Sequence, residues 1–511
     1  MKLLRITSVL VILFPLILLI SCSPVPEISR DSDDDPVYGE TRTKQTQIEF
    51  RLQNIMKRDE FRHTLPSMII MSADYGDTIF SYKSDLLVRP ASNQKILTSA
   101  AALKLLGPSY NYRTVIYRTG PIQDGHLNGD LIIKGFGDPL LNLDDLDRFV
   151  ETLQLFGISE ITGNIIVDDS FFDEVHWPSG WMWDDEPHPY VPYISALSVN
   201  SNIVSISVNR SNQPDNAVTV QVTPNSSYIQ YELHTEPSKN NRNQELRIIP
   251  DRMSGRNNYL IKGDPSQSRL PRTFNVTVRE PAMFTGILLQ EKLSGAGIIT
   301  RGTVMRAVKD STAIPMVQTN TPLDSVLHAM NKVSDNLAAE STWKTIAAEQ
   351  YGIPGSGDGG RSAIEHALAK FEINTSPSQF VDGSGVSFYN LVTSRMLAEL
   401  LFRISEDPVL FKPFYESLSI LGVDGTLMRR GIHSKASGRV RAKTGTLTGV
   451  SSLTGYIDTL HGERLIVAML FQNFTLPAGR YRQIQDEICE ILIHFNREAS
   501  VLTSPISSSA D

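Results

Sequence analysis

Ser92-Asn93-Gln94-Lys95 is the stretch that decides the fold of this 511-residue chain. It follows the extended Arg89-Pro90-Ala91 and opens a run in which apolar residues recur at helical spacing as far as Leu106. Ser334-Asp335-Asn336 and Lys443-Thr444-Gly445 come later, in that order. Ser-x-x-Lys and Ser-x-Asn are common patterns, and we interpret a second copy, Ser341–Lys344, as an ordinary helix segment. The ordered set in these local contexts therefore carries the interpretation, and no single motif does.

The first motif has the chemistry of an activated nucleophile. Residues three apart lie one above the other on a helix, so Lys95 is expected beside the Ser92 hydroxyl. A serine hydroxyl is a weak nucleophile until a base takes its proton. A lysine can be that base when burial or a neighbouring cation lowers its pKa. The alternative is that Ser92 only caps the helix and Lys95 is a solvated side chain.

The other two motifs have the chemistry of a binding site. Ser334 can relay a proton toward a leaving group, and the Asn336 amide can bind a substrate backbone. Lys443 and nearby threonine hydroxyls can hold a terminal carboxylate, and Gly445 would let substrate backbone approach closely. The substrate-binding residues expected from these two motifs are Asn336, Lys443, Thr444, Gly445 and Thr446.

Other familiar motifs are either absent or lack the sequence context that their function requires. Gly355–Gly360 satisfies G-x-G-x-x-G, but it follows a helical pattern rather than a strand, so we interpret it as a flexible loop. The sequence has no His-Glu-x-x-His and no Gly-x-Ser-x-Gly, and its ten histidines show no metal-ligand spacing. We expect no metal and no cofactor.

The N-terminal residues indicate the compartment. Lys2 and Arg5 precede an apolar run from Val9 to Ile20, which is typical of a signal peptide and short for a membrane span of roughly 20 residues. Leu19–Cys22 resembles a bacterial lipobox, in which Cys22 would carry the lipid; the alternative is a plain secretory signal. Because Ser23 and not Asp follows, we expect a periplasmic lipoprotein anchored to the outer membrane, with no membrane contact beyond the lipid anchor.

Composition narrows the remaining possibilities. The net charge is −8 and no basic tract stands out, so nucleic acid is not an expected partner. Residues 23–47 are rich in Pro, Ser and Asp, and we interpret them as a disordered tether; residues 498–511 are a similarly polar tail. Cys489 lies in an apolar-periodic segment and is expected in a core. If Cys22 is lipidated, no disulfide can form within the chain.

The pattern along the chain indicates an α+β protein. A hairpin signal at Ser67–Tyr82, a strand pair at Val450–Phe474 and a closing helix at Arg480–Asn496 suit a sheet completed by both ends of the chain. Between them, short β-like runs indicate a β-rich insertion of two nested modules. The expected divisions are a signal peptide at 1–22, the tether, a main domain at 48–110 and 308–497, one inserted module at 111–185 and 270–307, a second at 186–269, and the tail.

The three motifs together resemble those of serine β-lactamases and penicillin-binding proteins. The long interval from Lys95 to Ser334, and the absence of Glu-x-x-Leu-Asn after Ser334, resemble the class C low-molecular-mass penicillin-binding proteins, the D-alanyl-D-alanine carboxypeptidase/endopeptidase family. This resemblance implies a serine β-lactamase/DD-peptidase-like domain, an antiparallel sheet flanked by helices, with a large two-module insertion. Further stretches that resemble the family lie at 129–139, 180–185, 195–200, 381–385 and 422–427.

The resemblance also implies roles. Ser92 would be acylated by the penultimate D-Ala carbonyl of a peptidoglycan stem peptide, with Lys95 as base and Ser334 passing a proton to the leaving amine. The backbone N–H groups of Ser92 and Thr446 would form the oxyanion hole. β-Lactam antibiotics would act as covalent inhibitors at Ser92.

Substrate preference depends on one residue of the insertion and on one difference from the family's sequence pattern. Asp185 matches the family's acidic residue that reaches the side-chain amine of diaminopimelic acid; the alternative is a loop carboxylate that caps a turn. Members often carry arginine directly after the residue equivalent to Ser387, whereas this chain has Phe388. Recognition of the diaminopimelate side chain is therefore open.

Two other functions compete with a carboxypeptidase. One is hydrolysis of β-lactams or esters on the same fold, against which the missing Glu-x-x-Leu-Asn argues. The other is an anchored peptidoglycan-binding protein with a degenerate site, against which the three intact motifs argue. The sequence favours a hydrolase of D-Ala-D-Ala, and of D-Ala–diaminopimelate cross-links.

Overall fold

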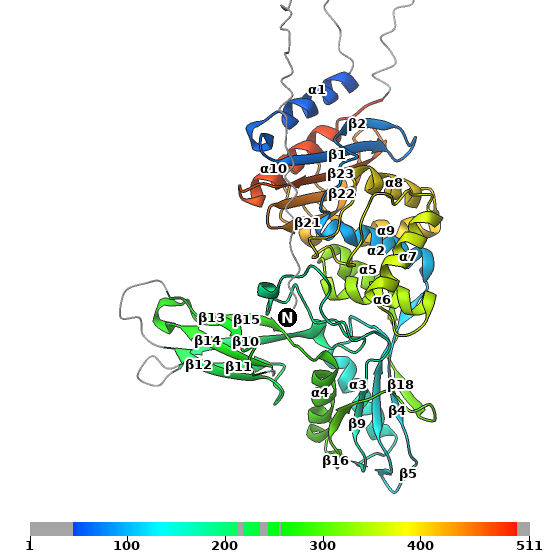
Figure 1. The fold of residues 1–511 in the computed structure, drawn as a ribbon, viewed down its shortest axis with the longest axis vertical. Coiled ribbons are helices and arrows are strands. Elements are labelled where there is room, and N and C mark those ends of the chain that lie inside the picture. Colours follow the sequence, from blue (N-terminus) through cyan, green and yellow to red (C-terminus); the bar gives the residue numbers. More distant parts are fainter. Residues whose placement is uncertain (1–43, 212–217, 236–243, 255–256, 498–511) are drawn as a thin grey trace, which may run out of the picture. The chain divides into compact units, whose positions relative to one another are not determined.

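A computed structural model describes residues 44–211, 218–235, 244–254 and 257–497 (Figure 1). The predicted signal peptide, Cys22 and the tail lie outside the described residues. The predicted tether also lies outside them, except that from Lys44 onward the chain forms helix α1 (Lys44–Met56). Within these described residues, no helix combines the length and the apolar character that crossing a membrane requires.

A six-stranded antiparallel sheet forms the centre of the main domain, with the strand order β2-β1-β23-β22-β21-β20. The strands are β1 (Leu65–Ser72), β2 (Thr78–Tyr82), β20 (Ser419–Ile420), β21 (Val440–Leu447), β22 (Val450–Asp458) and β23 (Arg464–Gln472). β1 pairs with β23 over its whole length, from Leu65 opposite Gln472 to Ser72 opposite Leu465. Both ends of the chain therefore complete this sheet, as predicted.

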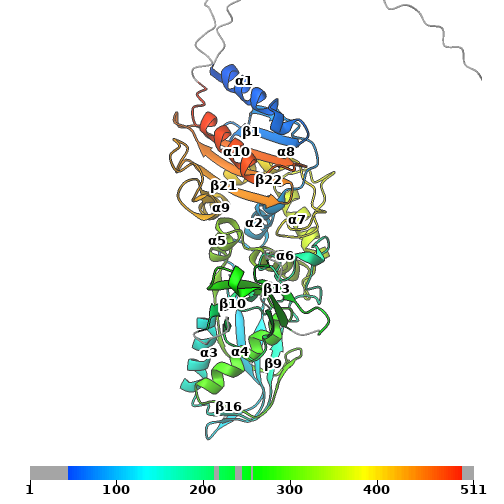
Figure 2. The ribbon, with the colours of Figure 1, turned by 90° about the vertical axis from the view of Figure 1, so that its left-hand side faces the viewer.

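The two faces of the sheet are buried by different helices because side chains alternate along a strand. Met68 and Ile70 of β1 pack in a core with α1 and α10 (Ala478–Leu492), which also contains Cys489. Ile69 and Met71 pack in the opposite core with α2 (Gln94–Leu105) and α8 (Ser394–Ser405). The sheet is thus a layer between two sets of helices (Figures 1 and 2).

Further helices extend the second core away from the sheet. They are α5 (Leu323–Lys332), α6 (Asn336–Tyr351), α7 (Gly357–Lys370) and α9 (Pro408–Ser417). The prediction of a flexible loop at Gly355–Gly360 was wrong, because α7 begins at Gly357, where Ser356 Oγ accepts from Gly359 N. A Cβ on Gly360 would lie 2.0 Å from Trp343 Nε1. The glycines there allow two helices to pack closely.

The long interval between α2 and α5 forms further sheets. It also contains helices, which the short β-like runs in its sequence did not predict. A five-stranded sheet has the order β17-β9-β7-β4-β18, and a four-stranded sheet has the order β16-β8-β6-β5. Two helices missed by the sequence analysis cover them, α3 (Leu143–Leu155) and α4 (Pro281–Gly295). The strands are β4 (Thr114–Arg118), β5 (Ile122–Gln123), β6 (His126–Leu127), β7 (Leu131–Gly135), β8 (Glu160–Ile161), β9 (Ile165–Asp168), β16 (Ile299–Thr300), β17 (Val304–Arg306) and β18 (Ile314–Gln318). β3 (Asn111–Tyr112) and β19 (Thr321–Pro322) pair with each other where the chain enters and leaves this region.

Two three-stranded sheets lie between β9 and α4 in the sequence. Their orders are β11-β10-β15 and β12-β14-β13. The strands are β10 (Ile203–Arg210), β11 (Val218–Thr223), β12 (Gln230–Thr235), β13 (Arg247–Pro250), β14 (Asn258–Gly263) and β15 (Arg272–Thr277). Their inward residues, such as Ile206 and Ile261, share one core with α3 and α4.

Candidate active site

Ser92 lies at the junction between α2 and the central sheet. It belongs to a short 3₁₀ turn, Ala91–Asn93, so α2 begins two residues later than the sequence pattern predicted. Asn93 Nδ2 donates to the carbonyl of Lys443 at 2.9 Å, and Ser452 Oγ donates to the carbonyl of Pro90 at 2.8 Å. These bonds hold the turn that carries Ser92 against β21 and β22.

Lys95 lies beside Ser92, as the helical spacing predicted. Its Nζ is 3.2 Å from Ser92 Oγ, 2.5 Å from Asn336 Oδ1 and 2.8 Å from the Ser384 carbonyl. The side chain is completely buried. Burial lowers the pKa of Lys95 to about 8, although the nearby carboxylates of Asp382, Glu340 and Asp335 act in the opposite direction. The neutral form that a base requires is therefore far more populated at neutral pH than in an ordinary lysine.

The second motif lies at the N-terminus of α6. Ser334 adopts a positive φ of 66°, and its Oγ accepts a hydrogen bond from Lys443 Nζ at 2.9 Å. Asp335 caps the helix by accepting from Ala338 N. Asn336 bridges two groups, because its Oδ1 accepts from Lys95 and its Nδ2 donates to the carbonyl of Tyr190.

The third motif lies within β21, although the sequence analysis placed it before the strand pair. Lys443 is completely buried, and burial together with the charge of Lys95 lowers its pKa. Thr444 Oγ1 donates to Thr426 Oγ1 at 2.8 Å. A Cβ on Gly445 would lie 2.9 Å from the Pro90 carbonyl oxygen and 3.0 Å from Ser92 N. The glycine thus lets β21 pack against the turn of Ser92, and Thr446 follows it on the same strand.

Asp185 comes from the inserted region and reaches this cluster through Tyr190. Met182 N donates to its Oδ2 at 3.2 Å, and Tyr190 OH donates to its Oδ1 at 3.1 Å. The backbone carbonyl of the same Tyr190 accepts from Asn336. The structure therefore shows the turn contact of the alternative interpretation, and it also joins Asp185 to the second motif.

A buried pair of carboxylates behind Lys95 was missed by the sequence analysis. Residues 382–387 form a tight turn, which we name the Asp382 turn. Asp382 accepts from Gly385 N at 2.8 Å, Ser387 N at 2.6 Å and the indole of Trp181 at 2.9 Å. Glu340, four residues after Asn336 on α6, accepts from the backbone N–H groups of Gly383 and Ser384. The turn that offers the Ser384 carbonyl to Lys95 is thus fixed from two sides.

Glu340 is completely buried, and burial raises its pKa to about 8, with the charge of Asp382 acting in the same direction. Its i, i+4 relation to Asn336 was the one signal in the sequence. The position often held by arginine in the family is Phe388, and the guanidinium of Arg89 lies 5.1 Å from the centre of its ring. A cation is therefore present beside this position, supplied by a different segment.

Within the described residues, no group of three or more His, Cys, Asp or Glu side chains could hold a metal ion. The arrangement instead joins a hydroxyl, a buried amine of lowered pKa and several hydrogen-bond donors. This combination suits serine acyl transfer.

Comparisons with known proteins agree with this geometry. The model of the D-Ala-D-Ala carboxypeptidase 3 (S13) family matches residues 49–493. A D-alanyl-D-alanine carboxypeptidase from Actinomadura is 30% identical over 434 residues, covering 82% of this chain and 80% of that protein.

Solved structures agree as well. The crystal structure of penicillin binding protein 4 from Haemophilus influenzae is 26% identical, with a TM-score of 0.78, covering 86% of this chain and 97% of that chain. A structure of the same protein complexed with a β-lactam has the same identity and coverage and a TM-score of 0.73. The predicted fold class is confirmed. The chain belongs to the D-Ala-D-Ala carboxypeptidase 3 (S13) family, and it is a serine-type D-Ala-D-Ala carboxypeptidase of peptidoglycan.

Proposed function

We propose that Ser92 is the nucleophile and Lys95 its base in the hydrolysis of D-Ala-D-Ala stem peptides. The neutral amine of Lys95 takes the proton of Ser92 Oγ, and the oxygen attacks the penultimate D-Ala carbonyl. The bond to the terminal D-Ala nitrogen breaks, and that nitrogen receives a proton through Ser334. Water then attacks the ester, releases the shortened peptide and restores the Ser92 hydroxyl. The observation that carries the proposal is the 3.2 Å contact between Ser92 Oγ and the Nζ of Lys95, whose side chain is fully buried.

The remaining motif residues bind the substrate in this proposal. Lys443 with the hydroxyls of Thr444 and Thr446 holds the terminal carboxylate, Asn336 binds substrate backbone, and the N–H groups of Ser92 and Thr446 stabilise the oxyanion. Asn336 Nδ2 already has a carbonyl partner in Tyr190, so substrate replaces that bond when it enters. Gly445 contributes space for the turn of Ser92.

The experiment is the intact mass of the protein without residues 1–43, after incubation with benzylpenicillin, beside the same fragment carrying Ser92→Ala. We expect one penicilloyl adduct on the wild type and none on Ser92→Ala. Ser341→Ala, which alters the second Ser-x-x-Lys, is the matched control and should keep the adduct. An adduct that persists in Ser92→Ala would contradict the assignment.

We further propose that the same site cleaves D-Ala–diaminopimelate cross-links, with Asp185 binding the side-chain amine. Its support is the link from Asp185 through Tyr190 to Asn336. Digestion of cross-linked muropeptides tests it. Asp185→Asn should lower kcat/KM for cross-linked dimers and leave benzylpenicillin acylation unchanged. Equal losses for both reactions would contradict the role.

The localisation that we propose is periplasmic, with Cys22 lipidated and the outer membrane as the anchoring surface. Its support is the charged start, the apolar run and the lipobox-like Leu19–Cys22. Labelling with a palmitate analogue and fractionation test it. Wild-type protein should carry the label in the outer-membrane fraction, whereas Cys22→Ser should be unlabelled. Label in the inner-membrane fraction would contradict the sorting.

A further inference from the structure

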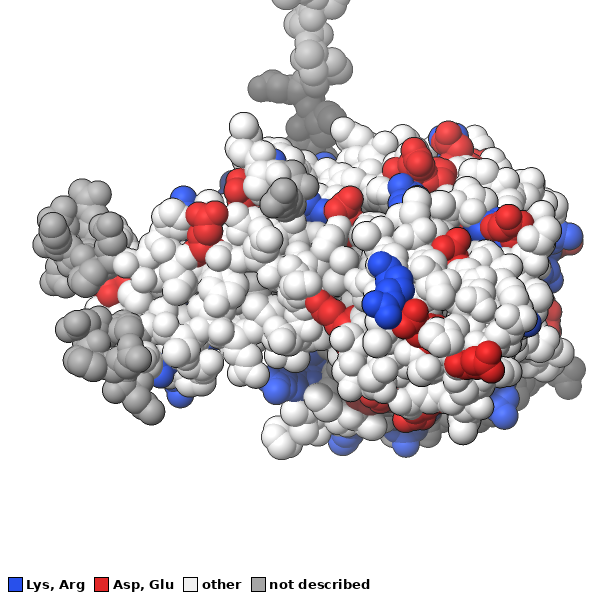
Figure 3. Space-filling view, turned by 90° about the horizontal axis from the view of Figure 1, so that it is seen from below, with Lys and Arg blue, Asp and Glu red and all other residues white. Residues whose placement is uncertain are grey.

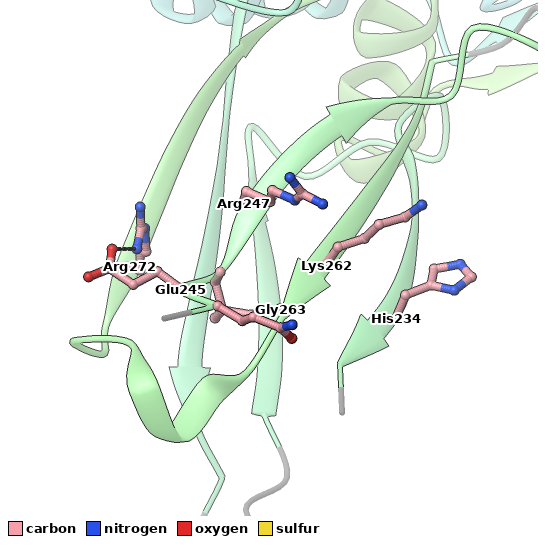
Figure 4. Close-up of a pocket in the computed structure, with 8 residues that line it drawn as sticks. His234, Glu245, Arg247, Lys262, Gly263 and Arg272 are labelled. Atoms are coloured by element: carbon pink, nitrogen blue, oxygen red, sulfur yellow. Dashed lines mark hydrogen bonds and ion pairs between the residues drawn. The ribbon is translucent and has the colours of Figure 1, made fainter. Parts of the chain in front are cut away.

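Three basic side chains stand in one row across the sheet of β12, β14 and β13. His234 of β12 is the register partner of Lys262 in the parallel pair, and Arg247 of β13 is its partner in the antiparallel pair. Figure 4 shows their side chains projecting from three neighbouring strands on the same side of the sheet. Directly opposite residues in a sheet have Cβ atoms about 4.5–5.5 Å apart. The row therefore brings three basic groups close together.

Nothing in the described part of the chain neutralises the centre of this row. The two nearest carboxylates are each paired with another cation, Glu232 with His234 at 3.1 Å and Glu245 with Arg272 at 2.8 Å. No ion pair involves Lys262 or Arg247 among the described residues. Like charges placed directly opposite each other destabilise a sheet. An anionic ligand would compensate this cost.

The row borders a recess that can admit such a ligand. The residues that line a pocket of about 590 Å³ include the three of the row, His234, Lys262 and Arg247, and the ion pair of Glu245 and Arg272. This volume lies in the range of small-molecule sites. The charge is local, because the chain as a whole carries −8 and the face in Figure 3 shows acidic and basic side chains interspersed.

We propose that the row of His234, Lys262 and Arg247 is a second binding site for the polymeric substrate, taking carboxylate groups of its stem peptides. The inference rests on the proposed function, since the occupant is the acidic polymer that the Ser92 site would cut. A peptidoglycan strand presents many stem-peptide carboxylates, so one stem can occupy this site while another occupies the active site. Linked contacts of this kind raise the affinity for the polymer without changing the reaction at Ser92.

The experiment compares polymer and short substrates in the double variant Lys262→Gln/Arg247→Gln. We expect kcat/KM for insoluble peptidoglycan to fall about fivefold at low salt and less at high salt, because salt screens exposed charges. Hydrolysis of a short D-Ala-D-Ala tripeptide and acylation by benzylpenicillin should remain within about twofold of wild type. Lys370→Gln removes an exposed charge on α7 and is the matched control.

Co-sedimentation identifies the anion. Wild type should pellet with peptidoglycan and lose this binding when the peptidoglycan carboxylates are amidated, whereas the double variant should bind weakly to both. Unchanged polymer turnover in the double variant would overturn the inference, as would wild-type binding to phosphatidylglycerol vesicles in preference to peptidoglycan. Absence of a penicilloyl adduct on the wild-type protein would instead contradict the proposed function.

Discussion

The indole N–H of Trp181 donates to Asp382 Oδ2 at 2.9 Å, and this bond joins the inserted region to the turn behind Lys95. The same turn offers the Ser384 carbonyl to Lys95 Nζ at 2.8 Å. The segment that carries Asp185 is thus connected through one buried carboxylate to the turn that contacts Lys95. A substitution at Trp181 should therefore change the rate of acylation at Ser92, although no bond joins the two residues.

Trp181→Phe should slow acylation by benzylpenicillin about tenfold and lower the unfolding temperature. It removes a buried hydrogen bond to a carboxylate, worth about 1.5–3 kcal/mol, and leaves Asp382 with one donor fewer. Stopped-flow acylation and thermal unfolding measure the two effects. Trp177→Phe is the control, because its indole bond to the Trp181 carbonyl is long, at 3.4 Å. Equal changes in both variants would contradict a specific role for the Asp382 bond.

The acylation rate should rise with pH and level off above a midpoint near 8. In the proposed mechanism the neutral amine of Lys95 is the base, and burial lowers its pKa to about 8. Below that pH the amine is protonated, so the rate should fall up to tenfold for each pH unit. A pH–rate profile of benzylpenicillin acylation measures this. A flat profile between about pH 6 and 9 would mean that Lys95 is not the base.

Glu340→Gln should move that midpoint to lower pH and reduce the maximal rate. Glu340 raises the pKa of Lys95 when it is ionised, and its own pKa of about 8 means that it ionises over the same pH range, so its removal lowers the pKa of Lys95. The rate falls because the amide offers one oxygen to the two N–H groups of Gly383 and Ser384. Glu349→Gln on the same helix, whose carboxylate accepts from Tyr110 OH at an exposed position, should leave the profile unchanged. A lower rate with an unmoved midpoint would indicate a role in folding alone.

Gly445→Ala should reduce acylation by about a hundredfold or more. The new Cβ would lie 2.2 Å from Ser452 Oγ, 2.9 Å from the Pro90 carbonyl oxygen and 3.0 Å from Ser92 N, so the turn of Ser92 must move. A misplacement of about 1 Å can cost about 100-fold in rate. Gly479→Ala has open space for its Cβ and should keep full activity. Normal acylation in Gly445→Ala would show that the turn tolerates displacement.

Local patterns predicted the parts of the fold that depend on neighbouring residues. The spacing of Ser92 and Lys95, and the strands at both ends of the chain, were read correctly because helix and strand periods appear directly in the sequence. α3 was not predicted, although Asn142 and Asp145 form a capping box before Leu146 and Phe149. The helix lies between short strands, whose β-like sequence patterns indicated a β-rich region.

Contacts between residues far apart in the sequence could not be predicted from helix and strand periods. Glu340 and Asp382 act through burial and through bonds to backbone N–H groups, and neither leaves a periodic signal. The role of Gly445 also depends on its neighbours in space. Its missing side chain makes room for protein, the turn of Ser92, whereas the sequence suggested room for substrate.

The pairing of β1 with β23 has a consequence for how the protein is made. Leu65 and Gln472 lie side by side in the sheet but far apart in the sequence, so the ribosome must add every residue between them before they can meet. Such distant pairing makes folding slow. Lys443 of β21 also emerges late, long after Ser92. A partly synthesised chain therefore holds Ser92, the proposed nucleophile, without the strands that position it, and we expect its reactivity to begin only after β21, β22 and β23 have been made.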